Sequence, residues 1–448
     1  MDLCHLDDSF ESPGARNINI YSTMRIADLK KAVENATALR GLYGNNEAIL
    51  AEQKKRYNSL IDSFQKTFSA ETAEVFSSPG RTEIGGNHTD HNFGRVLAGA
   101  VNLDNVAVAQ TNGTDKVRIL SSGYPQFEVD LSNLKPDKAE FYTSVALVRG
   151  IAARLKELGY AIGGFDAVID SGVPKGSGLS SSASFEVLIG AIFSHLFNNG
   201  KLDAVLNAQI GQYSENVFFG KPCGLMDQTA CSVGGLITID FADPKNPIVK
   251  KVNFDFTKTG CALVITDTGG NHADLNDEYA SLPADMKGVA AKLGKTVLRE
   301  VAPEALVKAI PELRKAGVSD RAILRALHFE GDNARVAEQV ADLEKGDFKA
   351  FLKKVVASGR SSFMYNQNVY PASAPQEQGL SLALALSDMV LGEEGAYRVH
   401  GGGFAGTIQA FVPENLVDKY VSTIEGVFGK GKCWKLFIRP QGSIKVEF

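Results

Sequence analysis

"PKGSGLSSSAS", residues 174–184, is the stretch that indicates most about how this chain folds. The run "FDAVID" (165–170) before it is typical of a β-strand, and the apolar run "FEVLIGAIF" (185–193) after it is typical of a buried helix. This order predicts a strand that ends at Pro174, a glycine–serine loop, and a helix that begins near Ser181.

The loop between that strand and that helix predicts a phosphate site. Gly176 and Gly178 allow the backbone to come close to a ligand and to adopt angles closed to other residues. The serines place hydroxyl and free N–H groups at a helix N-terminus, which carries a partial positive charge and binds phosphate. The simpler alternative is a serine-rich helix cap, but three consecutive serines exceed what capping requires.

Length and composition restrict the class of protein. A chain of 448 residues with 44% hydrophobic and 22% charged residues is expected to form a soluble, globular protein of two domains. Its net charge of −5 predicts neither nucleic-acid nor membrane partners. Five dispersed cysteines and the lack of a signal-peptide pattern favour a cytoplasmic location over a disulfide scaffold or a structural zinc site. We expect a monomer or weak oligomer.

The order of the predicted elements suggests three segments. Apolar residues recur at three- and four-residue spacing in residues 24–44 and 47–68, which predicts a helical N-terminal extension over 1–70. Strands and helices then alternate without the regular spacing of a doubly wound sheet, so we expect a two-domain α+β protein. The turn "DPKNP" (243–247) favours a boundary nearby, with an N-terminal domain over 71–257 and a C-terminal domain over 258–448.

A second motif, "GRTEIGGNHTDHNFG" (80–94), concentrates polar side chains between glycines. His88, Asp90 and His91 are too close in sequence for a typical zinc set, so a metal cage is the weaker interpretation. A structural turn is a second alternative. Carboxylate, imidazole and amide groups together can bind adjacent hydroxyl groups, so a clamp for a ligand rich in hydroxyl groups is the third interpretation.

Several motifs together resemble those of the GHMP small-molecule kinases. The loop at 174–184 resembles their phosphate-binding motif, and "VHGGGFAGTIQAFV" (399–412) resembles their third motif. Residues 80–94 resemble the galactokinase signature Gly-Arg-x-Asn-x-Ile-Gly-Glu-His-Thr-Asp-Tyr-Asn-x-Gly, and "CGLMDQ" (223–228) matches its Cys-Gly-x-Met-Asp-Gln segment. The resemblance implies a two-domain GHMP kinase fold with the active site in the cleft between the domains. It also implies transfer of the γ-phosphoryl group of ATP to the anomeric hydroxyl of galactose.

The resemblance also assigns residues to roles. Asp227 would be the catalytic base and Arg81 its partner, because a neighbouring arginine keeps the carboxylate ionised. Mg²⁺, the expected cofactor, would be bound by Ser182 and Glu215. The loop that would bind ATP consists of Lys175, Gly176, Ser177, Gly178, Leu179, Ser180, Ser181 and Ser182. The residues that would bind the sugar are Asn87, His88, Asp90, Gly224 and Tyr279.

The chain departs from the family pattern at a few positions. Asn87 replaces the glutamate that accepts a hydrogen bond from the exocyclic hydroxymethyl group, and "EIGG" (83–86) replaces Asn-x-Ile-Gly, with Glu83 and Gly85 unexpected. Ala405 replaces a glycine of the third motif. These departures leave the sugar open, with arabinose or an N-acetylhexosamine as alternatives to galactose. A non-catalytic sensor of galactose and ATP is the other alternative, although all four predicted catalytic and metal-binding residues are present.

Overall fold

The computed structural model describes residues 23–174, 176–270 and 275–448. A large mixed sheet is the centre of its first half. Within these residues the sheet has nine strands, in the order β1-β2-β3-β6-β4-β5, with β13 beside β2 and the β7–β8 pair beside β3. Only β4 and β6 are parallel among its pairs. The strands are β1 (Met24–Arg25), β2 (Thr72–Gly85), β3 (Arg95–Thr111), β4 (Lys116–Ser121), β5 (Phe127–Asp130), β6 (Phe165–Ser171), β7 (Leu236–Asp240), β8 (Ile248–Lys251) and β13 (Ile444–Lys445).

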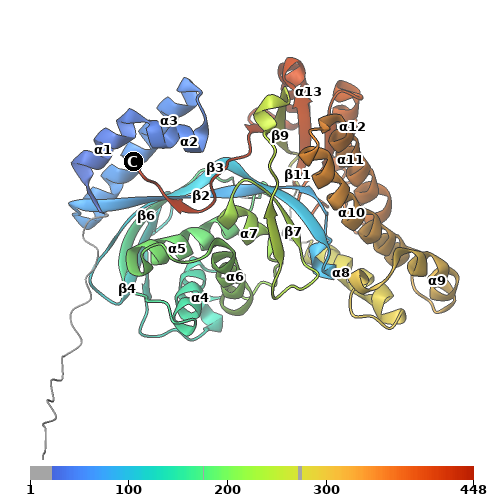
Figure 1. Ribbon diagram of the computed structural model, residues 1–448, viewed down its shortest axis with the longest axis horizontal. Helices are drawn as coiled ribbons and strands as arrows, with labels where there is room; N and C mark the ends of the chain where they lie inside the picture. The colour runs from blue at the N-terminus through green and yellow to red at the C-terminus, as the bar shows by residue number, and fades with distance from the viewer. Residues whose placement is uncertain (1–22, 175, 271–274) are drawn as a thin grey trace, which may run out of the picture.

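Helices cover both faces of this sheet, as Figure 1 shows. Val106 and Val108 of β3 pack toward the N-terminal helices, whereas Ala107 and Ala109 pack toward the later ones. Successive side chains of a strand point to opposite faces, so both faces of β3 are apolar and buried. On one face lie α1 (Ile26–Asn35), α2 (Thr37–Tyr43) and α3 (Glu47–Phe68). On the other lie α4 (Ser144–Glu157), α5 (Ser181–Asn198), α6 (Ala204–Ser214) and α7 (Met226–Val233).

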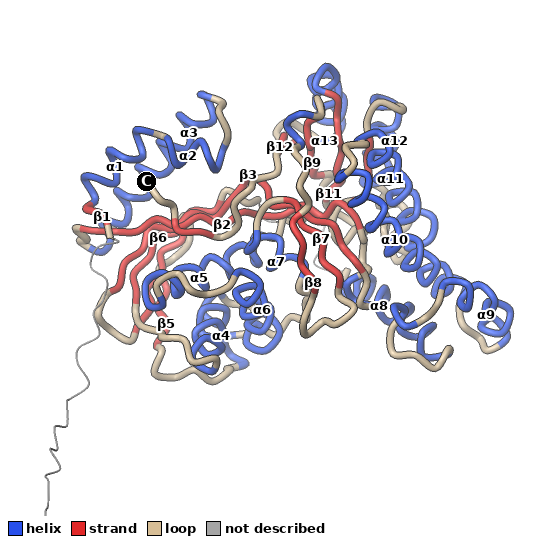
Figure 2. The backbone as a smooth tube through the Cα atoms, viewed as in Figure 1, coloured by secondary structure: helices blue, strands red, loops and turns tan. Residues whose placement is uncertain are grey.

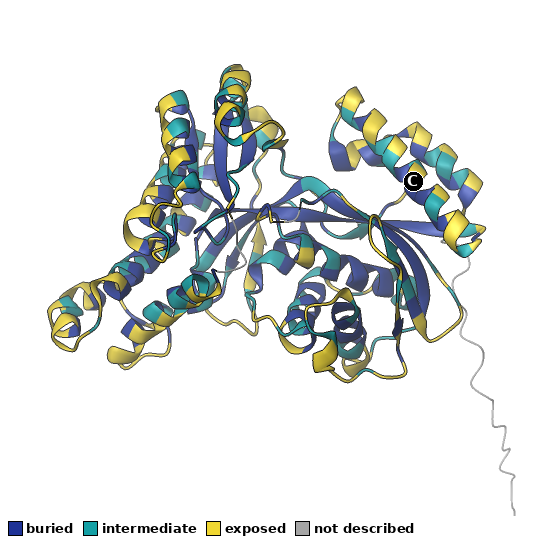
Figure 3. Cartoon of the chain, turned by 180° about the vertical axis from the view of Figure 1, so that it is seen from behind, coloured by how far each residue is buried: buried dark blue, intermediate teal, exposed yellow. Residues whose placement is uncertain are grey.

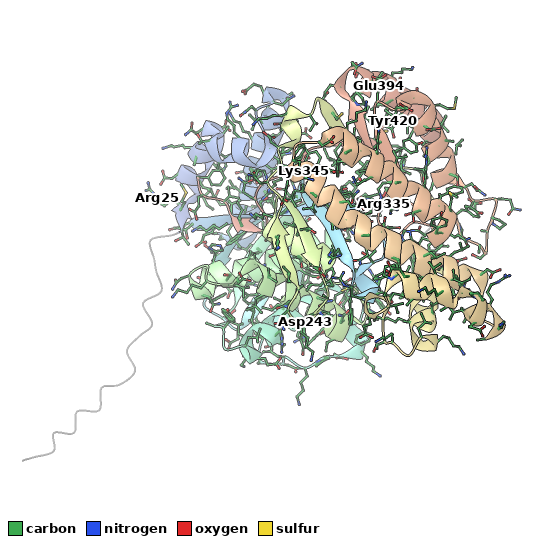
Figure 4. The ribbon with its side chains drawn as sticks, turned by 45° about the vertical axis from the view of Figure 1, so that its right-hand side comes forward. Arg25, Asp243, Arg335, Lys345, Glu394 and Tyr420 are labelled. Atoms are coloured by element: carbon green, nitrogen blue, oxygen red, sulfur yellow. The ribbon has the colours of Figure 1, made fainter. Side chains whose placement is uncertain are left out.

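The second half contains a smaller antiparallel sheet in the order β10-β11-β9-β12 (Figure 2). Its strands are β9 (Cys261–Asp267), β10 (Ala396–Val399), β11 (Thr407–Pro413) and β12 (Cys433–Leu436). One face packs on α12 (Gly379–Leu391) and α13 (Val417–Phe428), and the other on α10 (Asp320–Glu344) and α11 (Phe348–Ser361). Helices α8 (Asn276–Lys292) and α9 (Pro303–Lys315) extend beyond it. In Figure 4, Arg335 marks the course of α10 and Lys345 its C-terminal end.

A shared core joins the two halves. Ile84 and Leu97 of the large sheet belong to the same buried cluster as Ile265 and Phe411 of the small sheet. The strands at this junction are dark blue in Figure 3, whereas the outer faces of the helices are exposed. Residues from both halves can therefore meet at one fixed place.

The chain returns to the first half at its C-terminal end. Ile438 forms a bridge with Val101 of β3, and β13 pairs with β2. The prediction of a two-domain α+β protein is confirmed, while the exact boundaries at 70/71 and 257/258 stay predictions. The predicted division into three continuous segments did not anticipate that the last residues return to the large sheet.

The helical N-terminal extension is present from α1 to α3, and residues 1–22 lie outside the described part. A buried polar network attaches it to the rest of the protein. Arg56 of α3 donates to the Asp104 carboxylate at 2.7 Å, and Arg439 from the C-terminal segment donates to the same carboxylate at 3.0 Å. Tyr43 of α2 also donates to it, at 2.6 Å. Across the described ranges, no helix has the length and apolar character required to span a membrane.

Candidate active site

The glycine–serine loop has the predicted form, and α5 begins at Ser181. Gly176 and Gly178 have positive φ angles of 73° and 68°, and Ser180 has φ 59°. A positive φ is uncommon in a residue with a side chain and often marks a functional site. The side chain of Ser180 does not cap α5, so this N-cap residue leaves the N–H groups of the first helical turn unoccupied within the described part of the loop. These groups are available for an anion. Lys175 lies outside the described residues.

Asp227 and Arg81 form the predicted pair. Arg81 in β2 donates from Nε to Asp227 Oδ1 at 2.8 Å, and Asp227 lies in the first turn of α7. Ser180 donates to the other carboxylate oxygen, Oδ2, at 2.5 Å. Arg81 also donates from Nη1 to the carbonyl oxygen of Gly178. One guanidinium group therefore connects the candidate base with the glycine–serine loop.

The electrostatics of this pair favour an ionised carboxylate. Burial raises the pKa of Asp227, but the charge of Arg81 and the hydrogen bonds from Arg81 and Ser180 lower it further, so the net pKa is below the ordinary value. The side chain of Asp227 is 36% exposed, whereas that of Arg81 is 6% exposed. The carboxylate is thus charged at neutral pH and accessible from one side.

Asp90 and Gly224 lie against each other beside this pair. Asp90 opens the short 3₁₀ helix η1 (Asp90–Asn92), and its Oδ1 accepts a hydrogen bond from the main-chain N–H of His91 at 2.9 Å. A Cβ atom at position 224 would lie 2.2 Å from Asp90 Oδ2, so any side chain there would displace the carboxylate. Since Gly224 is three residues before Asp227, the candidate clamp and the candidate base are neighbours.

The C-terminal half contributes to the same clamp through its glycine-rich motif. His88 Nε2 donates to the carbonyl oxygen of Gly402 at 2.9 Å, and the Tyr279 hydroxyl donates to that of Gly403 at 2.9 Å. Burial lowers the pKa of His88 to about 4, so its ring is neutral at physiological pH. The structure therefore brings four of the five predicted sugar-binding residues into one region.

Asn87 is the exception, because it lies inside the protein rather than in the clamp. Its side chain is fully buried, and Nδ2 donates to Glu83 Oε1 at 3.0 Å and to the carbonyl oxygen of Gly401 at 2.8 Å. Its Oδ1 accepts from Ser362 Oγ at 3.2 Å and from Asn368 Nδ2 at 2.8 Å. An amide offers two donors and two acceptor positions. All four are engaged by the protein, so none remains for a sugar.

The two polar departures from the family signature contact each other. Glu83 accepts from Asn87 at Oε1, and Arg398 Nη2 donates to the same oxygen at 2.7 Å. Arg398 and Glu83 are both buried. The carboxylate and the amide have thus exchanged positions relative to the signature, and the carboxylate now faces a guanidinium. Both substitutions were visible in the motif. The ion-pair partner of Glu83 was not, because Arg398 lies 315 residues away and no local sequence pattern indicated it.

Glu215, one of the two residues predicted to bind Mg²⁺, forms a buried acidic pair with Glu186. Glu215 opens the π-helix η3 (Glu215–Phe219), and Gln228 Nε2 donates to both Glu215 Oε2 and Glu186 Oε2 at 3.0 Å. Glu186 is one helical turn after Ser182 on α5 and therefore on the same face. Its Oε1 has no hydrogen-bond partner among the residues that the structure describes. Burial and the charge of Glu215 raise the pKa of Glu186 well above its ordinary value.

These oxygen donors fit a hard cation such as Mg²⁺, which takes one or two protein ligands and binds phosphate oxygens as well. In the described residues no group of three or more histidine, cysteine, aspartate or glutamate side chains could hold a metal ion by itself. A metal bound here would therefore complete its coordination with phosphate or water.

Comparison with known proteins agrees with this geometry. Residues 146–235 match the GHMP kinases N terminal domain, and residues 62–111 match the galactokinase galactose-binding signature. The fold is similar to that of the Lactococcus lactis galactokinase complexed with galactose, with a TM-score of 0.73 and 24% identity over 86% of this chain and 98% of that chain. It is also similar to the Methanococcus jannaschii mevalonate kinase, with a TM-score of 0.58 and 14% identity over 82% and 98% of the two chains.

The match shows a GHMP kinase N-terminal domain over residues 146–235, and this range contains the start of α5 and the neighbouring Asp227 carboxylate. The second match narrows this class, because it covers the motif that contains Asp90 and its neighbours. The chain therefore contains both a GHMP kinase N-terminal domain and a galactokinase galactose-binding signature. It is accordingly a phosphotransferase that acts on a sugar hydroxyl group.

Proposed function

We propose that this protein is an ATP-dependent sugar 1-kinase that converts galactose to galactose 1-phosphate. The observation that carries the proposal is the position of Asp227, whose two carboxylate oxygens accept from Arg81 and from Ser180 at the start of α5. A base at the mouth of a phosphate-binding helix is where an attacking hydroxyl and a terminal phosphate must meet.

In the proposed reaction, the oxygen of the sugar C1 hydroxyl forms a bond to the γ-phosphorus of ATP. The bond from that phosphorus to the β–γ bridging oxygen breaks, and ADP leaves with its electrons. The hydroxyl proton passes to Asp227, which Arg81 keeps ionised until that moment. The guanidinium group of Arg81 also offsets charge on the phosphoryl group in transfer.

Bound Mg²⁺ would neutralise charge on the β- and γ-phosphates. In our proposal Ser182 and Glu215 hold it, and Gln228 orients the Glu215 carboxylate by its hydrogen bond at 3.0 Å. The N–H groups at the start of α5 hold the phosphate oxygens from the other side.

Asp90 and the Gly224 backbone would hold two ring hydroxyls of the sugar, with His88 and Tyr279 closing the site. Because the amide of Asn87 is engaged on all sides, it offers no acceptor to an exocyclic hydroxymethyl group. This favours a second candidate substrate class, aldoses that lack that group, such as arabinose. We further propose a cytosolic location, in keeping with free thiols at the four cysteines of the described ranges.

The proposal is tested by coupled ADP release with galactose, arabinose, N-acetylgalactosamine and glucose, followed by phosphorus NMR of the product. We expect an anomeric phosphate from galactose or arabinose. Asp227→Asn keeps the size of the side chain and should lower kcat by about 10²- to 10⁴-fold without loss of sugar binding. Undiminished turnover in Asp227→Asn, or phosphate on another hydroxyl, would contradict the mechanism.

A further inference from the structure

His400 links two separate segments of the N-terminal half to the glycine-rich motif of the C-terminal half. It follows β10 directly and its side chain is buried. Its Nε2 lies 3.1 Å from Thr82 Oγ1 and 3.4 Å from the main-chain nitrogen of Glu83, both in β2. Its Nδ1 lies 3.0 Å from Thr407 Oγ1 in β11. Neither the resemblance nor the family matches assign it a role.

The neighbours of the ring determine where its proton lies. The main-chain N–H of Glu83 can only donate, so Nε2 accepts and the neutral ring carries its proton on Nδ1. Nδ1–H then donates to the Thr407 hydroxyl, which in turn donates to the carbonyl oxygen of Ser177 at 3.0 Å. The hydrogen bonds therefore run in one direction, from β2 through His400 to the phosphate-binding loop.

The charged groups around the ring keep it neutral. Burial lowers the pKa of His400 well below its ordinary value, and the charges of Arg81 and Arg398 lower it further. The nearby carboxylate of Glu83 is engaged by Arg398 at 2.7 Å. A proton on Nε2 would also place two donors opposite each other, so the chain of hydrogen bonds requires the neutral ring.

His400 and Thr407 also lie directly behind the loop. A Cβ atom at Gly178 would be 3.0 Å from Thr407 Oγ1 and 3.1 Å from His400 Nδ1. The Gly178 carbonyl oxygen accepts from Arg81, and Ser180, two residues later, donates to Asp227. The inner side of the loop is thus held by the C-terminal half and its outer side is directed at the candidate base.

We propose that His400 is a positioning residue for the phosphate-binding loop, which it holds at Ser177 and Gly178 through the hydroxyl group of Thr407. The inference rests on the proposed function, because it takes residues 174–184 to be the loop that receives the phosphates of ATP. Nucleotide affinity then depends on a residue of the C-terminal half that need not touch the nucleotide.

Two amide variants separate the two sides of the ring. His400→Asn places an amide N–H near the position of Nδ1 and keeps the bond to Thr407, whereas His400→Gln places an acceptor near Nε2 and keeps only the contacts with β2. We expect His400→Gln to weaken binding of a non-hydrolysable ATP analogue with Mg²⁺, measured by calorimetry, by about 5- to 100-fold. The affinity of His400→Asn for the analogue should stay within about threefold of wild type, because the hydrogen bonds through Thr407 to Ser177 remain.

Thr407 provides an independent pair in case a histidine variant fails to fold. Thr407→Val removes the hydroxyl group at similar size and should weaken analogue binding as His400→Gln does, whereas Thr407→Ser should restore it. Equal losses in His400→Asn and His400→Gln, losses that only follow a drop in Tm, or a parallel rise in the sugar KM would overturn the proposal. Since binding is measured without turnover, failure of every sugar as a substrate would count against the proposed function and not against this inference.

Discussion

Gly224→Ala tests whether Asp90 binds the sugar. A Cβ atom at position 224 would lie 2.2 Å from Asp90 Oδ2, and real Cβ atoms essentially never come within 3.0 Å of a neighbour. The carboxylate must therefore move by at least 0.8 Å, the difference between these two distances. It cannot turn freely, because its Oδ1 accepts from the N–H of His91 at 2.9 Å.

Such a displacement should weaken one or both hydrogen bonds to the ring hydroxyls. A hydrogen bond to a charged group contributes about 1.5–3 kcal/mol, so losing one corresponds to about a 10- to 100-fold rise in the galactose KM. The assay is coupled ADP release, with galactose varied at saturating ATP and then ATP varied at saturating galactose. The ATP KM should stay within about twofold, because the phosphate loop is untouched.

Gly288→Ala is the matched control. Gly288 lies inside α8, and a Cβ atom there would meet nothing within 4 Å. This variant should leave both KM values unchanged and add up to about 1 kcal/mol of stability, since alanine favours a helix over glycine. An unchanged galactose KM in Gly224→Ala would refute the assignment of Asp90.

Three further predictions concern the surroundings of the site. Asn87→Glu should place a second carboxylate beside buried Glu83, whose pKa burial already raises, and should lower the free energy of unfolding by about 3–5 kcal/mol. The double variant Glu83→Asn/Asn87→Glu should recover part of this loss. Additive losses in urea unfolding would contradict the prediction. Asp104→Asn should lower the free energy of unfolding, measured in urea, by about 3–5 kcal/mol, because Arg56 and Arg439 lose the carboxylate that they share. The surface control Asp62→Asn should lower it by less than about 1 kcal/mol. Equal effects would show that the buried network does not stabilise the fold. The pKa of His88 is about 4 in the folded protein and about 6.5 in the unfolded one, so the unfolded state binds the proton first as the pH falls. The stability of wild type relative to His88→Gln should therefore be greatest above pH ~6.5 and should decline from there to about pH 4. A constant difference in Tm across that range would disprove the lowered pKa.

Some of the site could be predicted from local sequence because it is local in space. The strand, glycine–serine loop and helix over 165–198 are neighbours along the chain, and their hydrophobic pattern and glycine positions are sufficient to predict them. The pairing of Asp227 with Arg81 was predicted only through the resemblance, since 146 residues separate them. Their contact follows from the antiparallel β2–β3 pair and the packing of α7 on it.

The sequence by itself therefore predicted the class of chemistry, through a candidate phosphate-binding loop, an acid with its arginine, and a candidate hydroxyl clamp in family order. Tertiary structure alone decided which polar groups remain free to act. Asn87 has the chemistry to bind a sugar, but Gly401, Ser362 and Asn368, which lie 275 to 314 residues away, occupy its amide. A residue type specifies which hydrogen bonds a side chain can form, whereas only the folded chain specifies which partners have already formed them.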